Sequence, residues 1–119
     1  MDEWKTYGRL RKHAEESEKA LEKYLVDRVK LKKGMCLKYY NAGAPGWPDR
    51  IVMMPGGVTA WVELKSRGEK PRPLQRLRLE WLRDNGYIAG FVDCREDIDS
   101  VVELLARHSR IATGKEAEE

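Results

Sequence analysis

The sequence has few of the residues that build zinc sites, disulfide frameworks or membrane spans. Among its 119 residues are two cysteines and two histidines, and Cys36 and Cys94 lie far apart with no histidine close by. This spacing fits neither a zinc site nor a disulfide framework, so we expect the cysteines to be small buried residues. The longest apolar runs, such as residues 51–54, are far shorter than the roughly 20 residues of a membrane helix. We therefore expect a cytoplasmic protein with no membrane partner.

The sequence also lacks internal repeats and an apolar leader. It starts with Met1-Asp2-Glu3, whereas a signal peptide carries an apolar stretch near its start. With 41% apolar residues, a chain of this length can bury a core without disulfides or a structural metal ion. We expect a single domain over residues 1–119, with a core at about 17–108, a charged extension at 1–16 and a disordered tail at 112–119.

The charged residues are unevenly distributed along the chain. The net charge is 23 − 20 = +3. Residues 1–38 hold eleven Lys and Arg against seven Asp and Glu, and residues 65–83 hold seven against two. Residues 93–119 reverse this balance, with eight acidic residues and four basic ones. Basic segments kept apart from acidic ones indicate a face for a polyanion, although each segment alone also fits a solvated helix surface.

Hydrophobic periodicity predicts an α/β fold in the order α-β-β-β-α-β-α, a small mixed sheet flanked by helices. The first helix is expected from Ser17 to a stop at Gly34, the second from Pro73 to about Asn85, and the third around residues 98–105. Strands are expected over residues 35–40, 50–54, 59–65 and 87–92. The Pro55-Gly56-Gly57 turn predicts that the second and third strands pair antiparallel.

The predicted hairpin brings two carboxylates together. Side chains alternate along a strand, so Glu63 and Lys65 share one face with Trp61. A turn at residues 56–57 places Asp49 opposite Glu63 to within one residue of register. Paired carboxylates in a partly buried place repel, which raises a pKa or calls for a divalent cation with oxygen ligands. The alternative is a surface salt bridge of Glu63 with Lys65 or Arg50.

A third carboxylate is predicted on the first helix. Leu21, Leu25 and Val29 define its apolar stripe, and Glu18 lies within about 20° of the centre of that stripe, at about 100° per residue. Glu22 lies about 60° from it. Glu18 is therefore expected to point toward the core and toward the carboxylate pair. Its alternative place is a frayed first turn, where the helix dipole favours an acidic residue.

Four motifs follow one another along the chain: Gly-x-Pro-Asp-Arg at 46–50, Pro-Gly-Gly at 55–57, Trp-Val-Glu-Leu-Lys at 61–65 and Lys-Pro-Arg-Pro-Leu-Gln at 70–75. In this order they resemble the virus-type replication-repair nuclease (VRR-NUC) domain of the PD-(D/E)xK nuclease superfamily. The resemblance runs from about Glu18 to about Leu105 and includes Trp-Leu at 81–82 and Gly-Tyr at 86–87. It implies a restriction-endonuclease-like core and a stand-alone domain of the phage or bacterial kind.

The resemblance also implies an active site. Asp49 and Glu63 would bind Mg²⁺ or Mn²⁺ with the backbone carbonyl of Leu64 as a further ligand, and Lys65 would position the attacking water. Gln75 matches the motif glutamine of the family, and the glutamate of the first helix fits Glu18 better than Glu22. The catalytic residues implied in this way are Glu18, Asp49, Glu63, Lys65 and Gln75.

We therefore expect a divalent-metal-dependent endonuclease for branched DNA, such as Holliday junctions, in phage or bacterial replication, recombination or repair. Branched DNA comes from the resemblance alone. A nuclease of the same fold for flap, nicked or duplex DNA, and a non-catalytic nucleic-acid-binding module, are the alternatives. The DNA-binding residues are expected to be basic residues near the site: Lys38, Arg50, Arg67, Lys70, Arg72, Arg76 and Arg78.

Two further expectations concern the role of Trp47 and the oligomeric state. Trp47, beside Asp49, either contacts DNA or packs on the sheet, and packing is the more common role. A junction has two equivalent strands to cut, so a two-fold homodimer matches its symmetry. Trp4, Tyr7 and Leu10 are candidate dimer contacts in the N-terminal segment.

Overall fold

The structure is a computed structural model that describes residues 17–115. In this part of the chain the element order is α-β-β-β-α-β-α, and the sheet is mixed, which confirms the predicted fold class. The elements are α1 (Glu18–Leu31), β1 (Met35–Lys38), β2 (Arg50–Met54), β3 (Val58–Leu64), α2 (Pro73–Asp84), β4 (Ile88–Val92) and α3 (Arg95–Thr113).

The four strands lie in the order β1-β2-β3-β4. The pair β2–β3 is antiparallel, as the hairpin signal predicted; β1–β2 is also antiparallel, and β3–β4 is parallel. Between β2 and β3 the chain turns through Gly56 and Gly57, whose φ angles of 86° and 77° favour glycine. The turn fixes Arg50 opposite Val62, and this register decides which side chains meet at the end of the hairpin.

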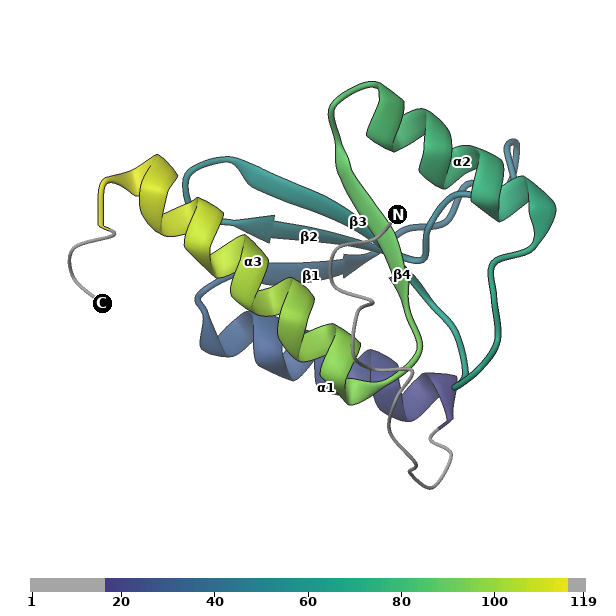
Figure 1. Cartoon of the computed structure of the whole chain (residues 1–119), viewed down its shortest axis with the longest axis horizontal. Helices are drawn as coiled ribbons and strands as arrows, with labels where there is room; N and C mark the ends of the chain where they lie inside the picture. Colours follow the sequence, from purple (N-terminus) through teal and green to yellow (C-terminus); the bar gives the residue numbers. More distant parts are fainter. Residues whose placement is uncertain (1–16, 116–119) are drawn as a thin grey trace.

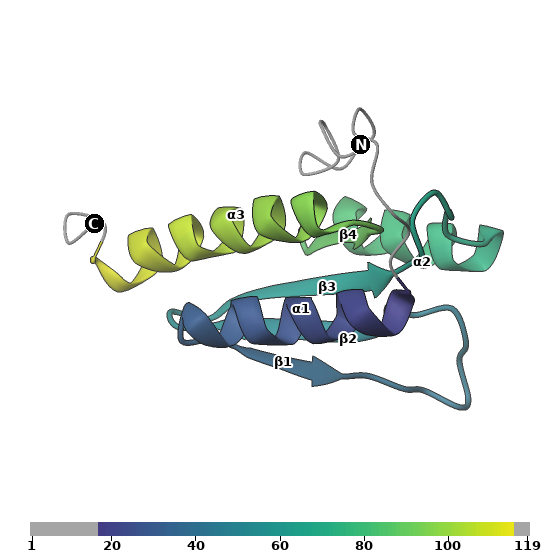
Figure 2. The same ribbon diagram turned by 90° about the horizontal axis from the view of Figure 1, so that it is seen from below.

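The main apolar core lies between one face of the sheet and the helices α1 and α3 (Figures 1 and 2). On α1 the predicted stripe of Leu21, Leu25 and Val29 is fully buried. Alternate residues of β2 and β3, among them Val52 and Val62, meet this stripe because side chains of a strand alternate between its faces. The amphipathic helix α3 packs beside α1 on the same face of the sheet, and its apolar residues belong to the same core.

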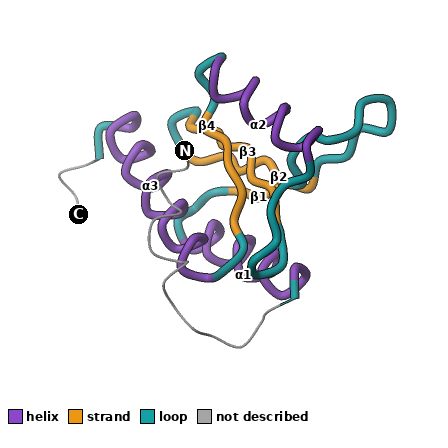
Figure 3. The backbone as a smooth tube through the Cα atoms, turned by 45° about the vertical axis from the view of Figure 1, so that its right-hand side comes forward, coloured by secondary structure: helices purple, strands orange, loops and turns teal. Residues whose placement is uncertain are grey.

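On the opposite face of the sheet from α1, the helix α2 packs over β4 and the neighbouring part of β3 (Figure 3). Leu79 and Leu82 of α2 form a second, smaller cluster with Ala89 of β4. Trp47 and Trp61 pack against this cluster, with their ring centroids 6.1 Å apart. The packing role of Trp47 is therefore the observed one. Glu63 and Lys65, which are odd-numbered like Trp61, also belong to the α2 face.

Several element boundaries differ from the sequence prediction. The first strand ends at Lys38 rather than at residue 40, and the chain then leaves the sheet in a loop that returns at Asp49. The last helix continues to Thr113, beyond the expected start of the tail, because Gly114 ends it with a left-handed cap at φ 74°. The predicted extension at 1–16 lies outside the described residues, as do Trp4, Tyr7 and Leu10. Within residues 17–115 no helix is long and apolar enough to cross a membrane.

Candidate active site

Asp49 and Glu63 meet at the end of the β2–β3 hairpin. Arg50 pairs with Val62, so Asp49, one residue earlier, is level with Glu63, as the sequence predicted. The backbone N–H of Leu64 donates to Oδ2 of Asp49 at 3.1 Å, which ties the Asp49 side chain to β3. The two carboxylates are therefore placed by strand register and one backbone hydrogen bond, not by flexible loops.

The carboxylate of Glu63 is buried, with 2% of the residue exposed. Its Oε2 atom accepts a hydrogen bond from Nε2 of Gln75 at 2.8 Å and lies 3.3 Å from Nζ of Lys65. Its Oε1 atom is also buried, yet it has no hydrogen-bond partner among the described residues. Burial of a carboxylate oxygen without a partner is costly, so this atom has an unused capacity to accept a proton or bind a cation.

Burial and the negative charge of Asp49 raise the pKa of Glu63 to about 7, while Lys65 opposes the shift. The expectation of repelling carboxylates with a raised pKa is thus confirmed. The alternative of a surface salt bridge is wrong. Lys65 does contact Glu63, but the Lys65 side chain is 10% exposed and both residues lie on the face that α2 covers.

Gln75 links the site to the start of α2. Pro73 is the first residue of α2, as predicted, and Gln75 lies in the first turn. Oε1 of Gln75 accepts from the backbone N–H of Arg72 at 2.9 Å, while its amide donates to Glu63. One amide therefore holds the end of a helix and one oxygen of the buried carboxylate. The family resemblance identified this residue, whereas hydrophobic periodicity contained no signal for it.

Glu18 lies near the site but is not buried. It is the first residue of α1, after the Ser17 cap, and it is exposed, so the expectation that it points into the core is wrong. Its place in the first turn is the alternative that the helix dipole favours. Partial burial and the charge of Asp49 raise the pKa of Glu18, while Lys65 opposes the shift. Glu22 is held elsewhere, since its Oε2 accepts from Arg50 at 2.8 Å.

The predicted DNA-binding residues fall into two groups. Lys38, Lys70, Arg72 and Arg76 are exposed. The guanidinium of Arg50 is used by Glu22 and by the backbone carbonyl of Cys36, and its side chain is 14% exposed. Arg78 and Arg67 are half-buried. Nε of Arg78 donates to the carbonyl of Pro45 at 3.2 Å, and its guanidinium lies 4.9 Å from the ring centroid of Trp47.

A cavity of about 410 Å³ opens beside Lys65. Its walls are almost all charged or polar, and they come from the first turn of α1 and from the segment between β3 and α2. They are Glu18, Lys65, Ser66, Glu69, Lys70 and Arg72. Three of these wall residues are basic and two are acidic.

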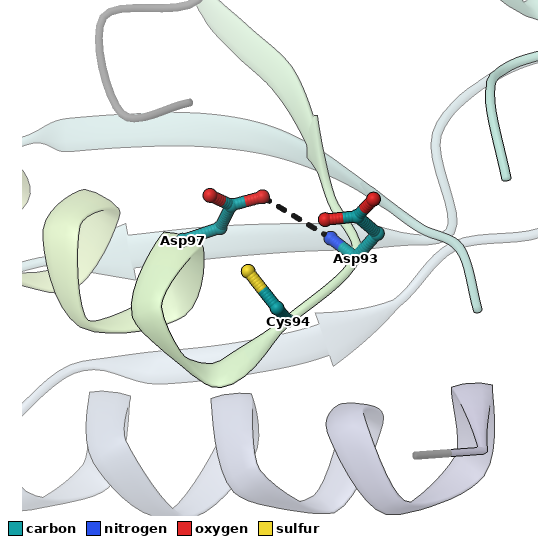
Figure 4. A group of neighbouring side chains, drawn as sticks. All are labelled: Asp93, Cys94 and Asp97. Atoms are coloured by element: carbon teal, nitrogen blue, oxygen red, sulfur yellow. Dashed lines mark hydrogen bonds between the residues drawn. The ribbon is translucent and has the colours of Figure 1, made fainter. Parts of the chain in front are cut away.

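A second acidic group, which the sequence analysis missed, joins β4 to α3 (Figure 4). Asp93, Cys94 and Asp97 are buried, and their ligand atoms all lie within 4.8 Å of one another. The carboxylates accept backbone hydrogen bonds: Oδ2 of Asp93 from Gly68 at 3.0 Å, and Oδ2 of Asp97 from Asp93 at 3.4 Å. Their position before and within the first turn of α3 is the sequence signal, and it is typical of helix capping.

Comparisons with known proteins bear on the family and the fold. No model of a known protein family matches the chain. A solved structure described as "VRR_NUC domain" superposes with a TM-score of 0.68 and 31% sequence identity, over 72% of this chain and 94% of that one. The protein named "Putative nuclease p44" of Acyrthosiphon pisum secondary endosymbiont phage 1 is 43% identical over 58 residues. That match covers 49% of this chain and 62% of the phage protein, less than two thirds of its length.

The fold and the site define a class of α/β domain in which two carboxylates and a lysine meet at one end of a β-hairpin against a glutamine from a helix. The likeness to the solved structure covers nearly all of that domain at 31% identity. The chain belongs to the VRR-NUC family, which confirms the resemblance of its motifs.

Proposed function

We propose that this chain is a divalent-metal-dependent endonuclease that hydrolyses phosphodiester bonds in DNA. The observation that carries the proposal is the buried Glu63 carboxylate, level with Asp49, whose Oε1 atom has no partner among the described residues. Membership of the VRR-NUC family and the nuclease name of the phage relative support the same reaction.

The residues present fit a hard divalent cation. Carboxylate and carbonyl oxygens are the ligands that Mg²⁺ and Mn²⁺ prefer. The positive charge of such an ion, added to that of Lys65, would offset the repulsion between Asp49 and Glu63. We assign the ligands as Asp49, Glu63 and the backbone carbonyl of Leu64, with Glu18 as a further carboxylate at the mouth of the site. When bound, the ion supplies Lewis acidity toward the phosphate and lowers the pKa of bound water.

The chain's own residues then perform separate tasks. Lys65 brings a compact positive charge with three donors to the phosphate and to the attacking water. Gln75 holds one oxygen of Glu63 and leaves the other oxygen for the ion. The N–H of Leu64 orients Asp49 in the same manner. Precise placement of these groups matters because phosphoryl transfer depends on in-line geometry and on stabilisation of negative charge.

Exposed basic side chains are proposed to bind the DNA backbone. Lys70 and Arg72 line the charged cavity beside Lys65, and Lys38 and Arg76 are also exposed. We leave Arg50 and Arg78 out of this surface because their guanidinium groups already bind protein atoms. Replacing Arg72 and Arg76 with glutamine should weaken DNA binding and reduce the salt slope by about two, since each phosphate contact releases roughly one counterion. An unchanged slope would place the DNA on another face.

Branched DNA, such as a four-way junction, is the proposed substrate, cut by a homodimer in phage or bacterial replication, recombination or repair. The family and the phage relative support this setting. A two-fold dimer presents two sites with the symmetry of the junction. The proposed contacts Trp4, Tyr7 and Leu10 lie outside the described residues. Light scattering at micromolar concentration measures the mass, and a monomer that stays monomeric on junction DNA would contradict the dimer.

One panel of substrates tests the activity itself. Duplex, nicked, flap and four-way junction DNA are incubated with the protein in Mg²⁺, in Mn²⁺ and in EDTA. We expect cleavage in either metal, none in EDTA, and none by Asp49→Asn in any condition. Cleavage that persists in EDTA would refute the metal-dependent mechanism, and binding without cleavage in all conditions would make the chain a binding module.

A further inference from the structure

A second hollow lies on the other side of the candidate active site. It has a volume of about 240 Å³ and is bordered by residues 39–42 and 44–47 together with Asp49 and Gln75. Two of its wall residues therefore belong to the site itself. Glu63 lies between the two hollows, because its Oε2 atom contacts Gln75 on this side and Lys65 on the charged side.

The loop that forms this hollow is fixed to the rest of the protein. It runs from the end of β1 to the start of β2 and extends beside α2 (Figure 3). The N–H of Tyr39 donates to the carbonyl of Asp49 at 2.8 Å and closes the loop at its base. Arg78 holds the carbonyl of Pro45, and Gly46 lies so close to Leu74 that an added Cβ atom would come within 2.7 Å of Leu74 Cγ. These contacts preform the hollow before any ligand binds.

The walls of this hollow differ in chemistry from those of the charged one. Tyr39, Tyr40 and Trp47 are aromatic, and Tyr40 is 85% exposed, so its ring is open to a ligand. Nδ2 of Asn41 donates to the hydroxyl of Tyr39 at 3.1 Å, and its Oδ1 accepts from the N–H of Gly43. The second amide hydrogen of Asn41 and the hydroxyl proton of Tyr39 therefore remain as hydrogen-bond donors. A flat, apolar ligand with hydrogen-bond acceptors at its edge matches these walls.

We propose that this hollow binds an unpaired nucleobase of the DNA strand that is cut, with the neighbouring phosphates in the charged hollow. The inference rests on the proposed nuclease function and narrows its branched substrates to those with an unpaired nucleotide beside the cut. Bases stack on aromatic side chains whatever their identity, and an unpaired base can leave the helix to do so. A base within a continuous duplex is stacked and paired, and removing it costs free energy. The hollow thus favours DNA with an unpaired nucleotide next to the cut.

An abasic scan tests this proposal. In a flap substrate, one abasic site at a time is moved through the single-stranded nucleotides around the mapped cut, and kcat/KM is measured in Mg²⁺. We expect one or two positions beside the cut where loss of the base lowers kcat/KM by roughly 5- to 150-fold, the range that corresponds to one stacked base. Tyr40→Ala should lower kcat/KM on the intact flap by a similar factor and remove its sensitivity to the abasic site. Tyr40→Phe should restore both.

The control is Tyr87→Ala, because Tyr87 is 49% exposed, follows α2 and does not border the hollow. It should keep the sensitivity of the wild type, and melting temperatures will show that each variant folds. A wild-type enzyme that is insensitive to every abasic site, or that cuts continuous duplex as well as the flap, would overturn the nucleobase site. Absence of cleavage of any substrate in Mg²⁺ would instead refute the nuclease function on which the inference rests.

Discussion

Residues 17–115 contain two groups of neighbouring carboxylates, which lie at the ends of two adjacent parallel strands. Asp49 and Glu63 lie beside the end of β3, and Asp93 and Asp97 lie after the end of β4. By proximity alone the second group is the better candidate for a metal site, because its three ligand atoms lie within 4.8 Å of one another. The two groups differ in the side chains that lie beside their carboxylates.

At the end of β4 the carboxylates accept hydrogen bonds from backbone N–H groups. Asp93 holds the N–H of Gly68, which fixes the segment after β3, and Asp97 accepts from the N–H of Asp93 at the start of α3. Burial also raises the pKa of the Cys94 thiol, which disfavours the thiolate that a metal would need. At the end of β3, the amide of Gln75 and the ammonium group of Lys65 lie beside the buried carboxylate of Glu63. Proximity of carboxylates alone therefore does not decide between the two groups, and the neighbouring side chains favour the end of β3 as the metal site.

The largest expected effect separates the two groups by activity. Glu63→Gln keeps the shape of the side chain but removes its charge, and it should lower the cleavage rate at least 10³-fold, about 4 kcal/mol of transition-state stabilisation. Asp97→Asn should cleave within a few-fold of the wild type. Rates on flap DNA under single-turnover conditions measure both. If Asp97→Asn is as inactive as Glu63→Gln while its circular dichroism is unchanged, the assignment of the active site to the end of β3 alone would be wrong.

Lys65 tests whether the positive charge in the site acts in the reaction. Lys65→Ala should lower the cleavage rate about 100-fold, because the charge that stabilises the phosphate is lost. DNA affinity should fall less than threefold, since Lys65 is one contact among many. Fluorescence anisotropy of labelled DNA gives the affinity, and the matched control is Lys19→Ala, an exposed lysine in the first turn of α1. Cleavage by Lys65→Ala at the wild-type rate would reduce Lys65 to an ion-pair partner of Glu63.

Metal binding should stabilise the fold through the first group only. At 100 times its dissociation constant, Mg²⁺ should add about 2.7 kcal/mol to the free energy of unfolding, which corresponds to a rise of roughly 10 °C in melting temperature. Asp49→Asn should lose this rise, and Asp97→Asn should keep it. Thermal unfolding in Mg²⁺ and in EDTA measures the shift. A rise that disappears in Asp97→Asn would move the metal site to the end of β4.

Much of this arrangement could be predicted from the sequence because local rules govern it. The glycines at 56 and 57 fixed the hairpin, and the hairpin placed Asp49 level with Glu63. Pro73 marked the first residue of α2. The apolar stripe of α1 was predicted correctly, yet its periodicity placed Glu18 in the core, since a helical angle does not tell where the core ends along the helix axis.

Other features depend on contacts between distant segments and have no local signal. Glu63 is buried where Gln75, at the start of α2, contacts β3, so a Glu-x-Lys motif alone could not distinguish it from a surface ion pair. Arg78 was predicted to contact DNA because it lies in a basic segment, but its Nε atom donates to the carbonyl of Pro45 in the loop before β2. The hollow beside Asp49 is formed by that loop together with Gln75, which is 26 residues further along the chain. Tertiary packing decides each of these cases.

The raised pKa of Glu63 predicts how stability depends on pH in the absence of metal. The pKa of Glu63 is about 7 in the folded chain, against an ordinary value of 4.5, so between these values the folded state holds a proton that the unfolded state has lost. The free energy of unfolding should therefore fall as the pH rises from about 4.5 to 7, by roughly 1–3 kcal/mol. Glu63→Gln cannot titrate and should lose this fall. Urea unfolding in EDTA at pH 5, 6, 7 and 8 measures it, and equal slopes in both proteins would assign the titration to another group.

The smallest expected effect belongs to Asp97, and it concerns stability alone. Asp97 lies in the first turn of α3, where the helix dipole favours a negative charge, and its carboxylate accepts from the backbone N–H of Asp93. Asp97→Asn keeps an acceptor but loses the charge, so it should destabilise the fold by about 0.5–1 kcal/mol, with the same loss in Mg²⁺ and in EDTA. Glu103→Gln is the matched control, because Glu103 lies in the middle of the same helix with a side chain that is 57% exposed, and its change should be near zero. A loss from Asp97→Asn that is larger in Mg²⁺ than in EDTA would mean that this carboxylate holds the ion, and the distinction between the two acidic groups would then be wrong.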